Sequence, residues 1–182
     1  SAAGNNSGKN RIPRPASVPA GMAGVIAVAA NNTALDRACF SNCGDVAAPG
    51  GDGRDLNQPG DGVCKPRVDE CGDGDCPVAL IGPAIKPPLN NENDVEYVFW
   101  SGSSFSAPLA SGLAALVVNA GAGRFSPELV RKLIECGAIQ RDEYALGAGI
   151  IHIPSTMAAC EEALQAAKRS AAEGGGTPTD TN

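Results

Sequence analysis

The sequence predicts an α/β domain. Short apolar runs rich in valine and isoleucine, which are typical of buried strands, occur in the same chain as longer segments of helical pattern. Glycine and proline account for 23 and 14 of the 182 residues and indicate many turns. The apolar fraction of 43% is ordinary for a globular protein, so the chain is long enough for one domain with its own core.

Five short apolar segments are expected to form strands. They cover residues 24–30, 37–42, 77–82, 95–100 and 147–153. The second segment is followed by "CGD" and then by "APGG", which is a turn signal. From about residue 50 to about residue 93, glycine, aspartate, proline and asparagine dominate, and we interpret this stretch as an irregular insertion.

Residues 105–118 form the first expected helix. Nearly every residue in this segment is apolar or small on all sides, which is typical of a helix buried in the middle of a domain. A second helix is expected within residues 125–137, with Ser126 as its N-cap and Pro127 at the first helical position. We expect Gly137 to end it.

The last expected helix covers residues 155–169. Its pattern is amphipathic, and basic residues lie at its C-terminal end, as the helix dipole favours. We therefore expect one domain over residues 1–169, interrupted by the insertion at about 50–93. The final segment, "SAAEGGGTPTDTN" at 170–182, has low complexity and predicts a disordered tail or linker.

The charge and hydropathy of the chain exclude several partner classes. Its net charge of −6 argues against nucleic acid or an anionic membrane surface as the main partner. We find no apolar stretch of the length needed to span a bilayer, so no membrane is expected as a partner. The chain begins at "SAAGNNSG" without an initiator methionine or a signal peptide, and we expect a processed chain or a fragment.

Seven cysteines are more than a cytosolic protein of this size usually carries. Cys64, Cys71 and Cys76 cluster in a stretch rich in glycine and aspartate, which predicts disulfide pairing among them in a secreted protein. A zinc site is the alternative, but the spacing lacks paired C-x-x-C ligands and no histidine lies nearby. Cys39 and Cys43 are too constrained in an extended strand to pair easily with each other. Because seven is odd, at least one thiol stays free or has its partner outside this chain.

The stretch "WSGSSFSAPLASGLAALVV" at 100–118 places small polar residues directly before the apolar helix. Ser103 and Ser104 would lie at the helix N-terminus, where free N–H groups and the helix dipole stabilise an anion. A serine nucleophile needs such a place, because attack on a carbonyl builds negative charge on oxygen. A serine that only caps the helix is the plainer alternative. The nucleophile elbow G-x-S-x-G does not fit, because Ser106 stands in place of its second glycine.

Residues 102–108, Gly-Ser-Ser-Phe-Ser-Ala-Pro, resemble the Gly-Thr-Ser-Met-Ala-x-Pro pattern of subtilisin-like serine peptidases, the subtilases. Further blocks resemble that family in the same order, namely "SAAGN", "VIAVAA" with "ACFSNCG" and "DVAAPG", "FSPELVRKLIECGA" and "LGAGIIHIPSTMAA". The resemblance covers about residues 1–50 and 95–165. It implies a subtilisin-like three-layer fold, with a mainly parallel sheet that carries helices on both faces, of which only the C-terminal half is present.

The resemblance also implies roles for individual residues. Ser104 is the expected nucleophile, and the side-chain amide of Asn5 together with the backbone N–H of Ser104 is expected to stabilise the oxyanion. The residues expected to bind substrate are Ala3, Gly4, Asn6 and Ser103, together with the segment "PASVPAG" at 15–21. In this family the catalytic aspartate and histidine precede the oxyanion asparagine, so the resemblance places both of them upstream of this chain.

The expected function is therefore endopeptidase hydrolysis of peptide or protein substrates through an acyl-enzyme. The missing N-terminal half of the peptidase domain is the expected partner, and this chain alone is expected to be inactive. An inactive subtilisin-like pseudo-enzyme or interaction module is the alternative. A small disulfide-rich binding domain is disfavoured, because only three of the seven cysteines lie in the cysteine-rich loop.

His152 is the only histidine of the chain, yet the resemblance assigns the general base elsewhere. We expect His152 to be a structural polar residue at the start of the last helix. No cofactor is expected to be required and no metal ligand is assigned, although calcium is possible as a structural ion. Asp45 matches a position that the family sometimes uses for a weak cation site. The insertion is acidic and is more simply a solvated loop than a calcium site; its acidic residues are Asp52, Asp55, Asp61, Asp69, Glu70, Asp73 and Asp75.

Overall fold

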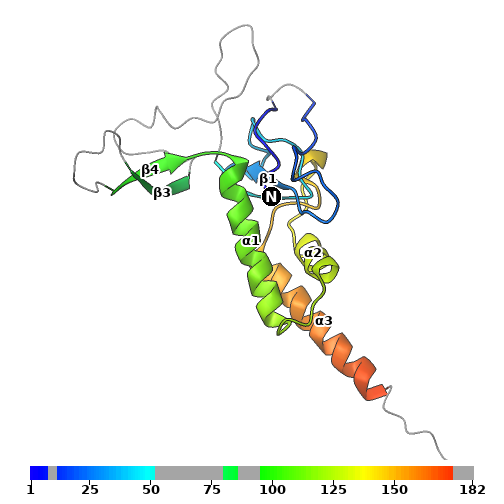
Figure 1. Ribbon diagram of the computed structural model, residues 1–182. Helices are drawn as coiled ribbons and strands as arrows, with labels where there is room; N and C mark the ends of the chain where they lie inside the picture. The colour runs from blue at the N-terminus through cyan, green and yellow to red at the C-terminus, as the bar shows by residue number, and fades with distance from the viewer. Residues whose placement is uncertain (8–11, 52–79, 86–94, 174–182) are drawn as a thin grey trace, which may run out of the picture.

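The computed structural model describes residues 1–7, 12–51, 80–85 and 95–173 (Figure 1). Its elements follow in the order β1 (Val28–Asn31), β2 (Val46–Pro49), β3 (Leu80–Ile85), β4 (Val95–Trp100), α1 (Ser103–Ala120), α2 (Pro127–Cys136), the 3₁₀ helix η1 (Tyr144–Leu146) and α3 (Ile153–Glu173). Most of the predicted insertion, including its clustered cysteines and acidic residues, lies outside the described residues.

A parallel sheet forms the centre of the domain. β1 and β2 pair in parallel, with Val28 opposite Val46. Single parallel bridges extend this pair on both sides, since Ala2 joins Val28 and Ile150 joins Ala47. The predicted α/β class with a mainly parallel sheet is confirmed, although the expected strand at 147–153 contributes only single bridges at Ile150.

The strand predicted at 37–42 is wrong. Arg37 makes one antiparallel bridge with Asn31, and a turn follows at 39–40. The second strand instead lies at Val46–Pro49, where the sequence suggested the approach to a turn. Residues 38–42 are buried, which explains their apolar pattern. These residues are buried because the segment folds back and packs into the domain, and not because it pairs with a neighbouring strand.

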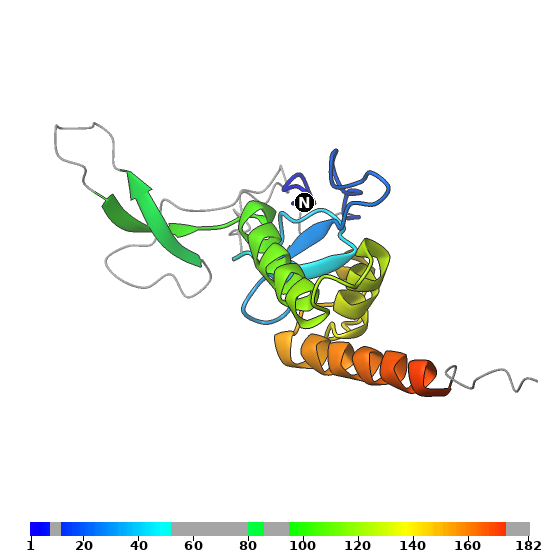
Figure 2. The same ribbon diagram turned by 60° about the horizontal axis from the view of Figure 1, so that its bottom comes forward.

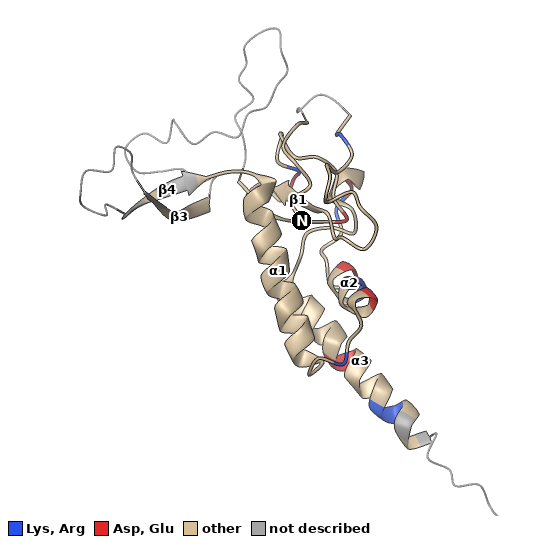
Figure 3. Ribbon diagram, viewed as in Figure 1, with Lys and Arg blue, Asp and Glu red and all other residues tan. Residues whose placement is uncertain are grey.

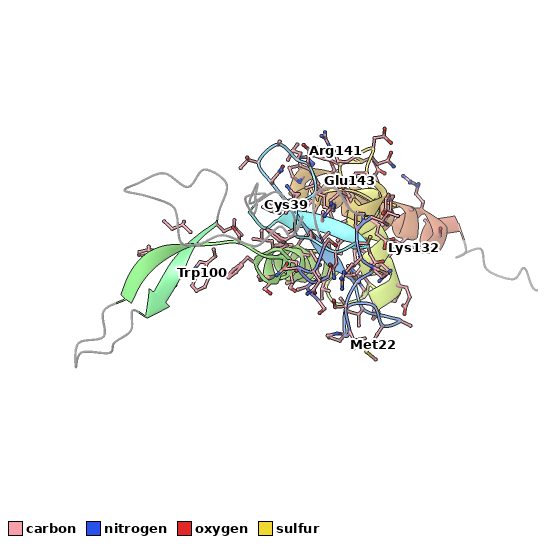
Figure 4. All side chains as sticks on the ribbon, turned by 90° about the horizontal axis from the view of Figure 1, so that it is seen from above. Met22, Cys39, Trp100, Lys132, Arg141 and Glu143 are labelled. Atoms are coloured by element: carbon pink, nitrogen blue, oxygen red, sulfur yellow. The ribbon has the colours of Figure 1, made fainter. Side chains whose placement is uncertain are left out.

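β3 and β4 form an antiparallel hairpin that projects away from the body of the domain (Figures 1 and 2). Its register places Leu80 opposite Trp100. At the end of β4 lies Trp100, which is labelled in Figure 4. The centroid of its ring is 5.2 Å from that of the Phe105 ring. This contact joins the hairpin to the start of α1.

α1 packs against β1 and β2 with one of its faces. The buried residues of that face are Ser103, Ser106, Ala110, Leu113 and Val117. The helix carries no charged residue (Figure 3), and by length and composition alone it could cross a membrane, contrary to our sequence expectation. Burial on all sides was also expected, whereas Leu109 and Leu116 remain 44% and 45% exposed.

α2 follows the predicted pattern. The Ser126 hydroxyl accepts a hydrogen bond from the backbone N–H of Leu129 at 3.3 Å, Pro127 occupies the first turn and Gly137 is the C-cap. α2 and α3 both pack against α1. α3 extends to Glu173, past residue 169, where we expected the tail to begin, and residues 174–182 lie outside the described part of the chain.

Candidate active site

The N-terminus of α1 is anchored to the end of β2. The backbone N–H of Gly102 donates to the carbonyl of Gly50 at 2.7 Å, and the Ser106 hydroxyl donates to the carbonyl of Pro49 at 3.2 Å. A side chain at Gly50 would collide with Ser106, so this crossing requires glycine. The short polar stretch before the helix is therefore held against the carboxyl end of a parallel strand, where sites of open α/β sheets usually lie.

Asn5 is fixed to this helix end by Ser103. Its side-chain Oδ1 accepts hydrogen bonds from the backbone N–H and from the hydroxyl of Ser103, both at 2.9 Å. The same hydroxyl accepts a hydrogen bond from the backbone N–H of Gly4 at 3.1 Å. Ser103 is fully buried. The structure thus joins two segments that lie 98 residues apart in the sequence.

Two hydrogen-bond donors remain free beside these contacts. Because Oδ1 of Asn5 faces Ser103, Nδ2 is turned toward Gly102, where a Cβ atom would lie 3.2 Å from it. Within the described residues, neither Nδ2 of Asn5 nor the backbone N–H of Ser104 has a hydrogen-bond partner. Ser104 itself is exposed. The arrangement can therefore bind an oxygen anion next to the Ser104 hydroxyl.

The residues expected to bind substrate lie in the same loop. Ala3 is buried, and its carbonyl accepts a hydrogen bond from the backbone N–H of Ser17 at 2.8 Å, which ties the loop to the segment at 15–21. Asn6 is exposed. A cavity of about 550 Å³ is lined in part by this segment. Its lining residues are Pro15, Ala16, Ala20, Gly21, Met22, Ala23, Gly24, Val25, Ala27, Cys43, Gly44, Asp45 and Arg131. It includes neither Asn5 nor Ser104, so we do not identify it as the substrate site.

Asp45 is occupied by protein groups. Its Oδ2 accepts a hydrogen bond from the backbone N–H of Ala27 at 2.8 Å and pairs with the guanidinium of Arg131 at 3.0 Å. The same guanidinium donates to the carbonyl of Val25. A cation bound at Asp45 would have to displace that guanidinium, so the residues present do not fit a metal at this position. Among the described residues there is also no cluster of three metal-ligating side chains.

His152 caps α3. Its Nδ1 lies 2.7 Å from the Ser155 hydroxyl and 3.4 Å from the backbone N–H of that residue. Its carbonyl accepts a hydrogen bond from the backbone N–H of Thr156 at 3.0 Å. A side chain that accepts from the first turn of a helix is a capping group, as expected for a structural residue here.

The described cysteines do not pair with one another. Cys43, Cys136 and Cys160 are free thiols, and burial raises the pKa of the thiols of Cys43 and Cys160. Cys39 is disulfide-bonded, and none of the other described cysteines is its partner. The expectation that Cys39 and Cys43 do not pair agrees with this. Pairing among the clustered cysteines stays a prediction, because they lie outside the described residues.

Three solved protease structures have a similar fold. A protease from Pseudoalteromonas arctica PAMC 21717 superimposes with a TM-score of 0.64 at 23% identity, over 87% of this chain and 41% of its own. The patellamide maturation protease PatA gives 0.57 at 23%, over 88% and 50%. The prenylagaramide maturation protease PagA gives 0.56 at 21%, over 87% and 49%.

The chain thus spans between 41% and 50% of the length of these structures, and their likeness shows the fold. No curated protein matches the chain by sequence. The family model described as "Subtilase family" matches residues 1–172, nearly the whole chain. By this match, and in agreement with its subtilisin-like fold, the chain belongs to the subtilase family.

Proposed function

We propose that this chain supplies the nucleophile and the oxyanion hole of a serine endopeptidase. Ser104 attacks the scissile carbonyl and forms the acyl-enzyme, while Nδ2 of Asn5 and the N–H of Ser104 donate to the oxyanion. One observation carries the proposal: both donors belong to the N-terminus of α1, Nδ2 of Asn5 beside Gly102 and the N–H of Ser104 in the first turn, and neither has a partner among the described residues. If Ser103 and Ser104 only capped the helix, nothing would require Nδ2 of Asn5 and the N–H of Ser104 to stay unpaired.

Ser103 serves this arrangement by holding Asn5. Its buried hydroxyl is engaged on both sides, by Gly4 and by Asn5, so we assign it a positioning role instead of direct contact with substrate. Because Asn5 is held in advance, no reorganisation is needed when charge develops on the substrate oxygen. Ala3, Gly4 and Asn6 lie in the same loop and form the proposed substrate-binding segment beside the hole.

The Ser104 hydroxyl requires a general base. His152, the only histidine of the chain, caps α3 through Nδ1. We therefore propose that the base and its aspartate come from the other part of the peptidase domain, which this chain needs as its partner. The substrate is a peptide or protein, and the seven cysteines favour a secreted protein. Calcium remains a proposal only for sites other than Asp45.

The test uses the complete protein that carries this chain, a generic peptide substrate and a fluorophosphonate probe that labels activated serines. We expect labelling at Ser104 and its complete loss in Ser104→Ala. In Asn5→Ala we expect kcat to fall by about 10²–10³-fold, the value known for the corresponding change in subtilisin. His152→Ala is the control and should leave kcat within about threefold. An absence of labelling and turnover in the complete protein would support the inactive alternative.

A further inference from the structure

The loop that carries Asn5 contains no helix or strand of its own beyond the single bridge at Ala2. Ser103 holds the side-chain oxygen of Asn5 and the backbone N–H of Gly4, but makes no hydrogen bond to the backbone after Asn5. Yet an oxyanion donor acts only if it stays within about 0.5 Å of its productive position. The backbone on either side of Asn5 therefore needs a support of its own.

The side chain of Asn42 gives this support. Its Nδ2 donates to the carbonyl of Ala3 at 3.2 Å and to the Ser17 hydroxyl at 3.1 Å. Its Oδ1 accepts from the backbone N–H of Asn6 at 3.1 Å and from the Ser7 hydroxyl at 2.9 Å. Asn42 is only 1% exposed, and this set uses both donors and both acceptor positions of its amide.

The backbone of Asn42 adds a fifth contact. Its N–H donates to the carbonyl of Gly4 at 2.9 Å. The approach is so close that a Cβ atom at Gly4, whose φ is 108°, would lie 2.7 Å from Nδ2 of Asn42. Before Asn5, Asn42 thus holds Ala3 and Gly4. After Asn5, it holds Asn6 and Ser7. It makes no hydrogen bond to the Asn5 side chain.

The segment that carries Asn42 is itself held by a partly buried ion pair. The Arg37 guanidinium, with a side chain 6% exposed, pairs with Glu143 at 2.9 Å. It also donates to the carbonyls of Ala38, Cys39 and Ser41, at 3.2, 3.1 and 2.8 Å. The Arg37 guanidinium thus contacts both Cys39 and Glu143, which are labelled in Figure 4. The segment that presents Asn42 is therefore fixed to η1 and not only to its sequence neighbours.

We propose that Asn42 is a positioning residue for the oxyanion hole, which it serves by fixing the backbone on both sides of Asn5. The inference rests on the proposed function of Asn5. Sequence analysis missed this residue, because "FSN" reads as the end of an apolar run. The available signal was a polar amide within a segment otherwise expected to be buried.

The test is a double-mutant cycle in the complete protein. Asn42→Ala should lower kcat by about 10- to 100-fold with KM changed by less than about threefold, because a displaced donor mainly costs transition-state stabilisation. In an Asn5→Ala background, the same substitution should lower kcat by less than about threefold, because its target is already gone. Equal losses in both backgrounds would overturn the proposal and leave Asn42 a purely structural residue.

Asn31→Ala is the matched control. Asn31 is also a buried asparagine, 2% exposed, but its Nδ2 donates to the carbonyl of Asn32 at 2.9 Å and its side chain makes no hydrogen bond to residues 1–7. We expect kcat within about threefold of the wild type. If Asn42→Ala does not fold, Asn42→Ser replaces it in the cycle with the same criteria.

Amide hydrogen exchange separates this inference from the proposed function. The amides of Asn6 and Ser7 should exchange faster in Asn42→Ala than in the wild type and in Asn31→Ala. If Asn5→Ala leaves kcat unchanged, or the complete protein is inactive, the proposed function fails and the role of Asn42 in catalysis fails with it. If Asn5→Ala lowers kcat while Asn42→Ala changes neither kcat nor exchange, only the inference about Asn42 fails.

Discussion

The two faces of α1 have different surroundings, although both are apolar. On the face toward β1 and β2, Leu113 and Val117 are 2% and 0% exposed. On an adjacent flank of the same helix, Leu109 and Leu116 are 44% and 45% exposed, with Gly112 between them at helical spacing. Apolar flanks of this kind usually mark interaction sites. The described chain thus surrounds only one side of its central helix, and we expect the rest of the peptidase domain to cover the other.

The largest expected effect comes from separating the two parts. Residues 1–182 alone should show no meaningful peptidase activity, because the oxyanion hole lacks its general base. In subtilisin, the hole and substrate binding alone leave an acceleration over water of about 10³–10⁴. Poor solubility should accompany the inactivity, because the apolar flank of α1 with Leu109 and Leu116 is exposed. Rapid fluorophosphonate labelling of Ser104 in this fragment, lost in His152→Ala, would show that the base lies in this chain.

A matched pair of leucines tests the two faces directly. Leu113→Ala should lower the free energy of unfolding by about 2–5 kcal/mol, because it opens a cavity against the sheet. Leu116→Ala should cost less than about 1 kcal/mol in residues 1–182, since its side chain is already half exposed. In the complete protein its cost should approach that of Leu113→Ala. Urea unfolding of both variants in both contexts measures this, and a small cost of Leu116→Ala in the complete protein would leave the flank uncovered.

The sequence predicted the elements whose signals are local. Ser126, Pro127 and Gly137 bound α2 as expected, because capping depends on residues within one turn. The segment at 37–42 was misassigned, because its burial depends on Arg37 and on Glu143, a residue 106 positions away. Burial of α1 on all sides was likewise predicted from its apolar composition. Composition does not tell which of the elements that pack against a helix belong to the same chain.

The candidate site divides in the same way. The "GSS" turn and the "AAGN" block were recognised through their family resemblance, and the structure brings Asn5 and Ser103 together. The supports of the site were not recognised. Asn42 acts through five hydrogen bonds to residues remote in sequence, and neither spacing nor hydropathy encodes such a set. Arg131, whose guanidinium pairs with the Asp45 carboxylate, was missed for the same reason.

A moderate effect on stability is expected at Arg131, whose contacts with Asp45 and Val25 lie entirely within this chain. Arg131→Met removes the guanidinium from Asp45 and from the carbonyl of Val25. We expect a loss of about 1 kcal/mol, limited by partial exposure of the pair. The variant should then gain more thermal stability from millimolar calcium than the wild type, because a carboxylate and a carbonyl become free to bind a cation. Arg131→Lys, which keeps the charge, is the control, and an equal calcium effect in wild type and Arg131→Met would contradict the assignment.

An effect no larger than that of Arg131→Met is expected at the cap of α2, a helix whose contacts with α1 and α3 lie within this chain. Ser126→Ala should lower the free energy of unfolding by about 1 kcal/mol. The loss should be the same in residues 1–182 and in the complete protein, unlike that of Leu116→Ala.

The same cap also predicts a pH dependence. The pKa of Glu128 is lowered by a hydrogen bond from its own backbone amide and then by one from Ser126. A lowered pKa adds stability above the ordinary carboxylate pKa, and this contribution disappears as the pH falls through the folded value. The cost of Ser126→Ala should therefore be larger at about pH 7 than at about pH 3. Ser111→Ala, at an exposed position of α1, should show no such pH dependence in the same urea titrations. If Ser126→Ala costs a different amount in residues 1–182 and in the complete protein, the surface that the rest of the domain covers would include α2 as well.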